Sequence, residues 1–528
     1  MHLVIVHGYL LRGTGSNIYT ANVAETWKRQ GHAVTVVCQD HLADTISFVD
    51  ELIVGTGKIP STPPPAGSVR VVVPDIGGLL LVYCKDRYQG FEVKTMRECS
   101  LKEIDAHIEW MVKSLKLVLD HGVDRVLTNH TILSPVIACR ACRGTGIPYD
   151  VMIHGSSIIF SIKPRPELRR YAIEGLQHCQ KVIVPSFHSA QLLTETFSGL
   201  GLEQKIVNIP CGMNPQVFQL ANGIQRNQER FLSSVQKFLQ RKPNGRRANT
   251  ISLPPSTSPT LHQVLTALSE TYDPIAVDAD LPERWNPIKK GEPVICFFGK
   301  FINTKGLAEL VMSFPLILEK IPNARLVVIG FGQFREHMEG MLAAMKSGDL
   351  PAFYAYARAG DFLDEVTDDQ KKHFFRKLSN EQLHQITITG FLEHDQLREI
   401  LPLASISVVP SKASEAFGMV SVEAMAAGVM PLCNKHSGLA DVLSSVEEME
   451  PELGALMRIE VQPGGVHGVA DGAFLVEQLP EKITTALHFL YPNGFDDDTR
   501  RKEISQKLRA VAVSKFSWEQ VGKQLLED

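Results

Sequence analysis

Residues 406–428 read ISVVPSKASEAFGMVSVEAMAAG, and this stretch decides the fold that we expect. Its first residues are small or apolar, as in a buried strand, and a polar loop then leads into a helical pattern after Gly418. A strand that passes through a short loop into a helix is half of a βαβ unit, the building block of parallel sheets. The unpaired amides at the start of such a helix point toward the place where open parallel sheets bind ligands.

The same alternation of apolar runs and helical patterns continues from this stretch toward both ends of the chain. In the second half the apolar runs are 294–298, 325–329, 385–389 and 406–409. In the first half they are 3–6, 33–37, 125–128, 149–153 and 181–184. Strands that alternate with helices in this way predict an α/β protein built from parallel sheets.

The alternation stops and restarts, which predicts two Rossmann-like βα domains. We expect the first at residues 1–220, a linker or insertion at 221–290 that contains a turn-rich polar tract, and the second at 291–505. A helical stretch at about 341–380 is longer than a simple crossover needs, so we interpret it as a helical insertion. Two such domains should face each other across a cleft at the carboxyl ends of their strands.

Composition excludes several classes of protein. Apolar residues make up 44% of the chain and charged residues 21%, which is typical of a globular protein and excludes a wholly disordered or fibrous one. The 54 Lys and Arg residues nearly balance 58 Asp and Glu residues, giving a net charge of −4. We therefore expect no nucleic-acid partner, and any anion site must be local. The composition gives no indication of the oligomeric state.

Cysteine usage and the chain's N-terminal residues favour a cytoplasmic protein. The 9 cysteines have no regular spacing, so a secreted disulfide framework is not expected, and the pair Cys139 and Cys142 lacks the second pair of a zinc site. Met1 leads directly into an apolar strand without the basic leader and apolar core of a signal peptide. No apolar run approaches the length of a membrane span, so any membrane contact would be peripheral.

The loop that follows the first strand is a candidate phosphate site. Glycines at Gly8, Gly13 and Gly15 precede a helical pattern, and glycines at that point let the backbone approach a phosphate. A dinucleotide fingerprint would need a third glycine where the chain has Ile18, although Asp40 keeps a nicotinamide oxidoreductase open as an alternative. A flexible turn without a ligand is the other interpretation.

Two lysines flank the loop that follows the first strand of the second domain. Lys300 and Lys305 are five positions apart, and Gly306 then opens a helical pattern. Two cations at this place could bind a diphosphate as point charges. Taken alone, they could equally be solvated loop lysines.

Two carboxylates lie in the opening stretch. Glu415 is in the loop and Glu423 is eight positions later in the helical pattern, so they can reach different parts of one extended ligand. Carboxylates accept hydrogen bonds from the paired hydroxyls that a sugar and a ribose present. Alternatively, Glu423 only offsets the helix dipole and Glu415 is a solvated loop acid.

The combination of these motifs resembles the retaining GT-B glycosyltransferases of carbohydrate-active family four. The resemblance rests on Glu415-x7-Glu423 with Phe417-Gly418 between them, on the loop 299–306 and on the segment 209–218. It covers roughly residues 1–220 and 291–528. The segment 516–519 is similar to the start of the family's last helix, so 506–528 is expected to return to the N-terminal, acceptor-side domain.

The resemblance implies a role for each candidate site residue. Glu423 would hold the nucleotide ribose, and Glu415 would bind hydroxyls of the transferred sugar. His154 matches a histidine beside that sugar and, with Glu415, is the predicted catalytic residue. The remaining predicted donor-binding residues are Gly15, Lys300, Lys305, Phe417, Gly418, Met419 and Val420. Lys300 stands where the family more often has Arg, so bidentate phosphate recognition is lost there.

The implied reaction moves a hexosyl group from a nucleotide diphosphate sugar, most often a UDP-sugar in this family, to an acceptor hydroxyl with retention. The acceptor is unidentified and would be a sugar, a sugar phosphate or a lipid-linked glycan. We expect no metal and no cofactor, with lysines and helix amides stabilising the leaving group. A nucleotide-sugar epimerase and a nonenzymatic nucleotide-sugar-binding protein remain as alternatives.

The segment 161–170 carries four cations and one acid, Glu167, in the domain expected to bind the acceptor. Its cations are Lys163, Arg165, Arg169 and Arg170. Such a charge run is typical of a solvated helix start, but it also fits a phosphate-bearing acceptor or an anionic membrane surface. We keep peripheral membrane contact as a hypothesis.

Overall fold

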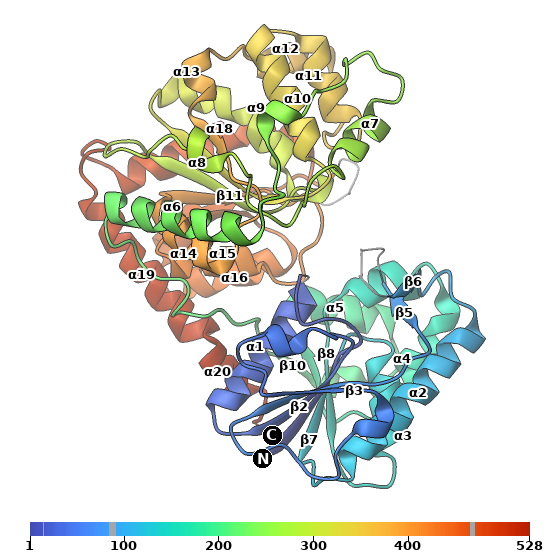
Figure 1. The fold of residues 1–528 in the computed structure, drawn as a ribbon. Coiled ribbons are helices and arrows are strands. Elements are labelled where there is room, and N and C mark those ends of the chain that lie inside the picture. Colours follow the sequence, from blue (N-terminus) through green and yellow to red (C-terminus); the bar gives the residue numbers. More distant parts are fainter. Residues whose placement is uncertain (14, 84–90, 465–469, 528) are drawn as a thin grey trace. The chain divides into compact units, whose positions relative to one another are not determined.

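The computed structural model describes residues 1–13, 15–83, 91–464 and 470–527, which form two compact units (Figure 1). Unit 1 consists of Met1–Gly212 together with Trp518–Asp528, and unit 2 consists of Met213–Ser517. Residues 221–290, expected as a linker or insertion, belong to unit 2. The expected range 506–528 is divided between the two units.

Unit 1 is built on an eight-stranded sheet in the order β10-β9-β8-β7-β1-β2-β4-β3, and each of its described strand pairs is parallel. Its strands are β1 (His2–Val6), β2 (Ala33–Val37), β3 (Glu51–Val54), β4 (Val69–Val73), β7 (Arg125–Asn129), β8 (Tyr149–Met152), β9 (Val182–Val184) and β10 (Ile206–Asn208). A separate parallel pair consists of β5 (Leu79–Val82) and β6 (Glu92–Thr95). Every residue of β1 and β2 is buried, as in a sheet covered on both faces.

Helices cover both faces of the unit 1 sheet (Figure 1). They are α1 (Gly15–Arg29), α2 (Leu101–Leu119), α3 (Ser134–Cys142), α4 (Arg169–His178), α5 (Phe187–Thr196) and α20 (Trp518–Gln524). Helix α20 packs on α1, where the indole Nε1 of Trp27 donates a hydrogen bond of 3.1 Å to the carbonyl of Gly522.

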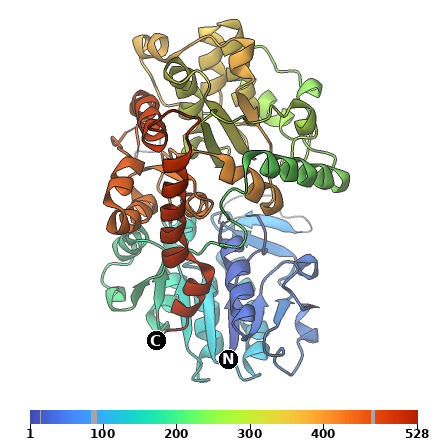
Figure 2. The ribbon, with the colours of Figure 1, turned by 90° about the vertical axis from the view of Figure 1, so that its left-hand side faces the viewer.

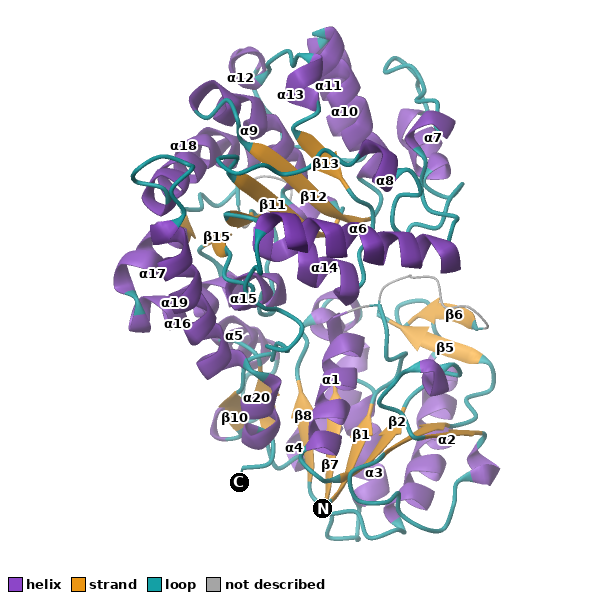
Figure 3. Ribbon diagram, turned by 60° about the vertical axis from the view of Figure 1, so that its left-hand side comes forward, coloured by secondary structure: helices purple, strands orange, loops and turns teal. Residues whose placement is uncertain are grey.

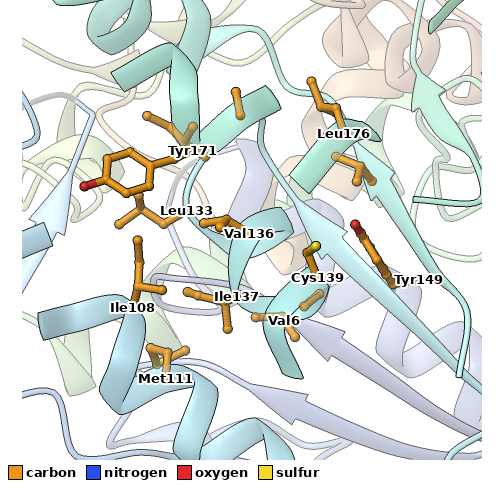
Figure 4. Close-up of a cluster of buried hydrophobic side chains, with 14 of the residues drawn as sticks. Val6, Ile108, Met111, Leu133, Val136, Ile137, Cys139, Tyr149, Tyr171 and Leu176 are labelled. Carbon is orange, nitrogen blue, oxygen red and sulfur yellow. The ribbon is translucent and has the colours of Figure 1, made fainter. Parts of the chain in front are cut away.

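Helix α3 lies in the centre of the unit 1 core (Figure 4). Val136 and Ile137 of α3 are buried beside Ile108 of α2, so α3 has almost no exposed face. Its Cys139 and Cys142 are buried free thiols, as are the other cysteines of the described ranges. Cys84 lies outside the described residues. The CxxC pair is therefore part of an apolar helix in this core.

Unit 2 is built on a six-stranded parallel sheet in the order β13-β12-β11-β14-β15-β16. Its strands are β11 (Val294–Lys300), β12 (Arg325–Phe331), β13 (Ile386–Ile388), β14 (Ile406–Val409), β15 (Met430–Asn434) and β16 (Arg458–Ile459). The opening stretch folds as expected, with β14 leading through a loop into the helix α15 (Met419–Ala426).

The other helices of unit 2 surround this sheet, with α9 and α18 on one face and α6 and α14 on the other (Figures 1 and 3). They are α6 (Ile224–Arg241), α7 (Leu261–Leu268), α8 (Leu281–Arg284), α9 (Leu307–Lys320), α10 (Arg335–Ser347), α11 (Leu350–Arg358), α12 (Asp368–Phe374), α13 (Asn380–Leu383), α14 (His394–Ile400), α16 (Ser437–Met449), α17 (Pro451–Met457), α18 (Gly472–Leu490) and α19 (Thr499–Phe516). Helix α19 is a long straight helix (Figure 2). The α/β fold class with two parallel βα units is confirmed.

Buried ion pairs hold the polar tract of residues 241–284 onto unit 2. The Arg246 guanidinium donates two hydrogen bonds, of 2.8 and 2.9 Å, to the carboxylate of Glu336 on α10, and both side chains are buried. Arg335 of α10 pairs with Asp278 at 2.7 Å in the same way. Two planar guanidinium pairs of this kind help to fix the path of this segment.

Candidate functional site

The loop between β14 and α15 is held in place by the start of α16. The backbone N–H of Glu415 donates to Ser437 Oγ at 2.9 Å, and the N–H of Gly438 donates to the carbonyl of Glu415 at 3.0 Å. A Cβ added at Gly438 would lie 2.5 Å from the carbonyl oxygen of Ala416, so only glycine allows this approach. Gly418 ends the loop with φ = 108°, a left-handed conformation that favours glycine. The sequence motif therefore fixes the backbone of the loop.

The Glu415 carboxylate is already paired within the protein. It forms an ion pair with Lys305 and accepts a hydrogen bond of 2.5 Å from Ser411 Oγ. Burial acts to raise the pKa of Glu415, but the charge of Lys305 and these hydrogen bonds outweigh it and hold the pKa below its ordinary value. Glu415 is therefore ionised, and the two residues predicted to bind the sugar and the phosphate contact each other.

Glu423 is in the opposite electrostatic state. Its carboxylate makes no hydrogen bond or ion pair within the part of the chain that the structure describes, and burial raises its pKa to about 8. The side chain projects from the second turn of α15 and is only half-buried. An unpartnered carboxyl of this kind can bind a hydroxyl group without first breaking an internal contact.

Lys300 and Lys305 lie at the carboxyl end of β11, beside the β14 loop. The Nζ of Lys300 is 5.7 Å from the centre of the Phe331 ring at the end of β12. Gly306 starts α9 with φ = 68°, and a Cβ there would lie 2.1 Å from the carbonyl oxygen of Pro410. This close packing brings the lysine loop against the Glu415 loop, because β11 and β14 are neighbours in the sheet.

The remaining residues of the predicted donor site differ in what they expose. The ring of Phe417 is buried and lies 5.7 Å from that of Phe516, so Phe417 offers its backbone to a ligand. Gly418, Met419 and Val420 are half-buried at the start of α15, where helix amides lack partners inside the helix. In unit 2 the predicted site residues therefore lie in the loops and the helix start that follow the neighbouring strands β11 and β14, and Lys305 and Glu415 are in contact.

Gly15 and His154, the two other predicted site residues, belong to unit 1. Gly15 is the first residue of α1, and a Cβ added there would meet nothing within 4 Å. His154 follows β8, and its Nε2 is 2.7 Å from Asn129 Oδ1. Burial lowers the pKa of His154 to about 3, so its imidazole is neutral near pH 7.

His154 is part of a histidine cluster that the sequence did not predict. His7, His130 and His154 follow β1, β7 and β8, which are adjacent strands. The ring of His130 lies 5.9 Å from that of His7 and 4.8 Å from that of His154. Burial lowers the pKa of all three. A histidine one or two positions after the end of each of three buried strands is the sequence signal that would have indicated this cluster.

Three of the four cations of the basic segment 161–170 contact other residues of unit 1. Arg165 donates to the carbonyls of Met96 and Cys99 and pairs with Glu167. Arg170 donates to Tyr171 Oη at 2.7 Å, and the Arg169 guanidinium lies 5.5 Å from the centre of the Phe197 ring. These contacts favour a structural helix start over a free cationic surface.

Three further observations concern the rest of the residues that the structure describes. None of the helices there is both long and apolar enough to cross a bilayer. Nor do three or more His, Cys, Asp or Glu side chains gather there as metal ligands would. A surface hollow of about 490 Å³ in unit 2 is lined by residues between 243 and 273, none of which is a predicted site residue.

The two parallel βα units give the chain the fold of solved GT-B glycosyltransferases, among them a sucrose-phosphate synthase from Thermosynechococcus elongatus with a TM-score of 0.51, 16% identity and coverage of 99% and 97%. Residues 13–217 match the family model described as Glycosyltransferase Family 4, and residues 282–448 match the one described as Glycosyl transferases group 1. The chain belongs to this family of group 1, family four glycosyltransferases.

Individual relatives are distant. The chain is 26% identical over 238 residues to an uncharacterized glycosyltransferase of Methanocaldococcus jannaschii, an alignment covering 45% of this chain and 44% of the relative. It is 24% identical over 250 residues to the sulfoquinovosyl transferase of Arabidopsis thaliana, covering 47% and 36%. The chain thus spans less than half the length of these two curated relatives. The UDP complex of HepE from Anabaena has the same fold, with a TM-score of 0.52, 13% identity and coverage of 99% and 98%.

Proposed function

We propose that this protein transfers a hexosyl group from a UDP-sugar to an acceptor hydroxyl, with retention at the anomeric carbon and without a metal. The observation that carries the proposal is the arrangement at the β14 loop: the Lys305–Glu415 pair stands beside the unpartnered Glu423 and the free amides of α15. A cation, helix amides, an ionised carboxylate and a protonated carboxyl group match the parts of a nucleotide diphosphate sugar. The Anabaena neighbour that binds UDP has the same fold.

Donor binding would exchange the internal contacts of the site for contacts with the ligand. The diphosphate would draw Lys305 away from Glu415, and sugar hydroxyls would then donate to the released carboxylate. Glu423 would accept a hydrogen bond from the ribose without losing a partner. The exchange is favourable only when the diphosphate and the sugar arrive together, which favours the intact donor over either fragment.

Transfer would proceed by attack on the face from which the diphosphate leaves. The bond between the anomeric carbon and the phosphate oxygen breaks, the acceptor oxygen bonds to that carbon, and the acceptor's proton passes to the departing phosphate. Negative charge would grow on the diphosphate, and Lys300, Lys305 and the first amides of α15 would stabilise it. His154 is neutral near pH 7, so it would exchange hydrogen bonds with the sugar rather than supply a positive charge.

The acceptor would be a sugar, a sugar phosphate or a lipid-linked glycan. The arginines of the basic segment are held by unit 1, so Lys163, which is exposed, is the better candidate in that segment for contacting a phosphate or a membrane surface. Replacing Lys163 with Ala and measuring acceptor KM and binding to anionic vesicles tests both roles.

Incubation with a panel of nucleotide sugars tests the proposed reaction. We expect free UDP to appear with a UDP-hexose, faster when an acceptor is added, and proton NMR to show the donor's anomeric configuration in the product. An inverted product would contradict retention. Conversion of the sugar while it stays on the nucleotide would identify an epimerase, and binding without turnover would identify a nonenzymatic binding protein.

Chelation tests the metal-independent leaving group. Because the proposal assigns the diphosphate charge to Lys300, Lys305 and helix amides, turnover in EDTA should equal turnover in its absence. Loss of transfer in EDTA that Mg²⁺ or Mn²⁺ restores would show that a metal carries this charge.

A further inference from the structure

A fully buried lysine lies near the start of the proposed donor loop. Lys412 follows Ser411, has no solvent exposure and lies 2.7 Å from Glu309 Oε1 and 3.7 Å from Asp364 Oδ1. Glu309 is also fully buried, and Asp364 is 2% exposed. Removing three charged groups from water is costly, and such clusters often add no net stability over an apolar replacement. The cluster therefore calls for an explanation other than stability.

The three side chains come from separate segments of unit 2. Lys412 belongs to the β14 loop, Glu309 to the first turn of α9, and Asp364 to the segment between α11 and α12, inside the helical insertion. Asp364 Oδ2 also accepts a hydrogen bond of 2.9 Å from the N–H of Gly472 at the start of α18. A Cβ added at Gly472 would lie 2.7 Å from Glu309 Oε1 and 2.8 Å from Asp364 Oδ2, so α18 closes the cluster tightly.

Two ion pairs connect the start of α9 with the β14 loop, and the loop supplies the anion of one pair and the cation of the other. On the half-exposed side Lys305 reaches Glu415, and on the buried side Glu309 reaches Lys412. The backbone N–H of Lys412 also donates to the carbonyl of Thr304 at 2.8 Å. When a donor exchanges the first pair for its own contacts, the second pair keeps the loop in position.

We infer that Lys412 is a positioning residue for the donor loop, and that Asp364 makes the helical insertion part of its support. The role of Lys412 rests on the proposed donor site. The buried cluster holds residues 411–418 in a fixed position relative to α9. Glu415 then stays directed at the sugar when Lys305 moves to the diphosphate. The cluster touches no ligand itself.

Hydrogen exchange of the ligand-free protein tests the positioning directly. We expect Glu309→Gln and Asp364→Asn to raise amide exchange in peptides covering 411–418 by about tenfold, while exchange in the unit 2 strands stays unchanged. Asp368→Asn, which removes an exposed pair with Lys371 on α12, is the matched control and should change nothing. Unchanged exchange at 411–418 in both folded variants would overturn the inference.

A comparison of two ligands separates positioning from general stability. Because Glu415 serves the sugar, the same variants should weaken binding of UDP-glucose about tenfold more than binding of UDP. Equal losses for the two ligands, in parallel with a lower melting temperature, would reduce the cluster to a structural role. If Glu415→Gln also leaves UDP-glucose binding unchanged, the donor assignment fails, and the exchange measurement still decides whether the cluster positions the loop.

A double variant covers the case in which a single variant does not fold. Glu309→Gln combined with Lys412→Met removes both members of the closest pair, so no buried lysine charge is left behind. We expect the double variant to recover the melting temperature that Glu309→Gln loses, but not the exchange protection of 411–418. Recovery of both would contradict the positioning role.

Discussion

The carboxyl edges of the two sheets carry different kinds of polar group. In unit 1, His7, His130 and His154 follow adjacent strands, and burial keeps all three neutral. In unit 2 the equivalent edge carries Lys305 and Glu415, which keep each other ionised. The difference shows that the same architecture can present either neutral hydrogen-bonding groups or paired charges, depending on whether the chain supplies a partner of opposite charge.

We expect the largest effect on activity when the charge of Glu415 is removed. Glu415→Gln loses charge-assisted hydrogen bonds worth about 1.5 to 3 kcal/mol, so kcat/KM should fall about 10- to 150-fold. Steady-state kinetics with a UDP-hexose measures this loss. Glu481→Gln, which removes an exposed carboxylate paired with Lys320, is the control and should keep normal turnover. Near-normal turnover of Glu415→Gln would exclude this carboxylate from the donor site.

Replacing Lys300 and Lys305 tests whether these two lysines of unit 2 bind the diphosphate. Lys305→Ala should weaken binding of UDP about tenfold and binding of uridine hardly at all, because its proposed partner is phosphate. Lys300→Ala should act in the same direction. Isothermal titration with both ligands measures the difference, and Lys320→Ala at the far end of α9 is the matched control. Similar losses for UDP and uridine would place both lysines elsewhere.

The neutral edge of unit 1 predicts sensitivity to acid. The pKa values of these histidines are lower in the folded state than in the unfolded state, so the unfolded state binds protons first as the pH falls. The free energy of unfolding is therefore unaffected above the ordinary pKa of 6.5 and decreases as the pH falls toward 4. His130→Asn removes one such group and should flatten the decline, measured as unit 1 hydrogen exchange at pH 7 and pH 5. Replacing the exposed His384 with Asn should leave the decline unchanged. An equal decline in wild type and His130→Asn would show that His130 does not contribute.

Glu423 predicts a smaller pH dependence of stability in unit 2, with the opposite sign. Its pKa is raised from 4.5 to about 8, so the folded state holds a proton that the unfolded state releases, and stability falls as the pH rises between these values. Glu423→Gln removes this dependence, so its melting temperature should gain on wild type between pH 5 and pH 8. Parallel melting curves across that range would contradict the raised pKa.

Much of the fold followed from the sequence because buried parallel strands are nearly continuous apolar runs. The β14 loop could also be predicted, since Gly418 and the two glutamates lie at a strand-to-helix junction. The contacts between charged side chains could not be predicted. A loop lysine such as Lys412 is normally solvated, and its burial depends on Glu309 and Asp364, which lie far away in the sequence.

Polar segments are hard to place from the sequence for a related reason. Arg246 lies in a turn-rich tract that the sequence indicates as a linker or insertion, and its bidentate contact with Glu336 is one of the ion pairs that anchor the tract in unit 2. The basic segment 161–170 is typical of a solvated helix start and also fits a charged surface, and sequence alone does not show that Arg165 donates to backbone carbonyls. Long polar side chains find their partners through tertiary structure, which local patterns do not encode.

The return of α20 to unit 1 has a consequence for the order of events during synthesis. Trp518 packs edge to face on Tyr19, with ring centres 5.3 Å apart, and Lys181 donates to the carbonyl of Glu527. The N-terminal unit therefore lacks part of its own packing until all of Met213–Ser517 has left the ribosome, a delay set by elongation at about 5–20 residues per second. During that interval the nascent first unit exposes the apolar face of α1 that α20 later covers, which is the kind of surface that chaperones bind.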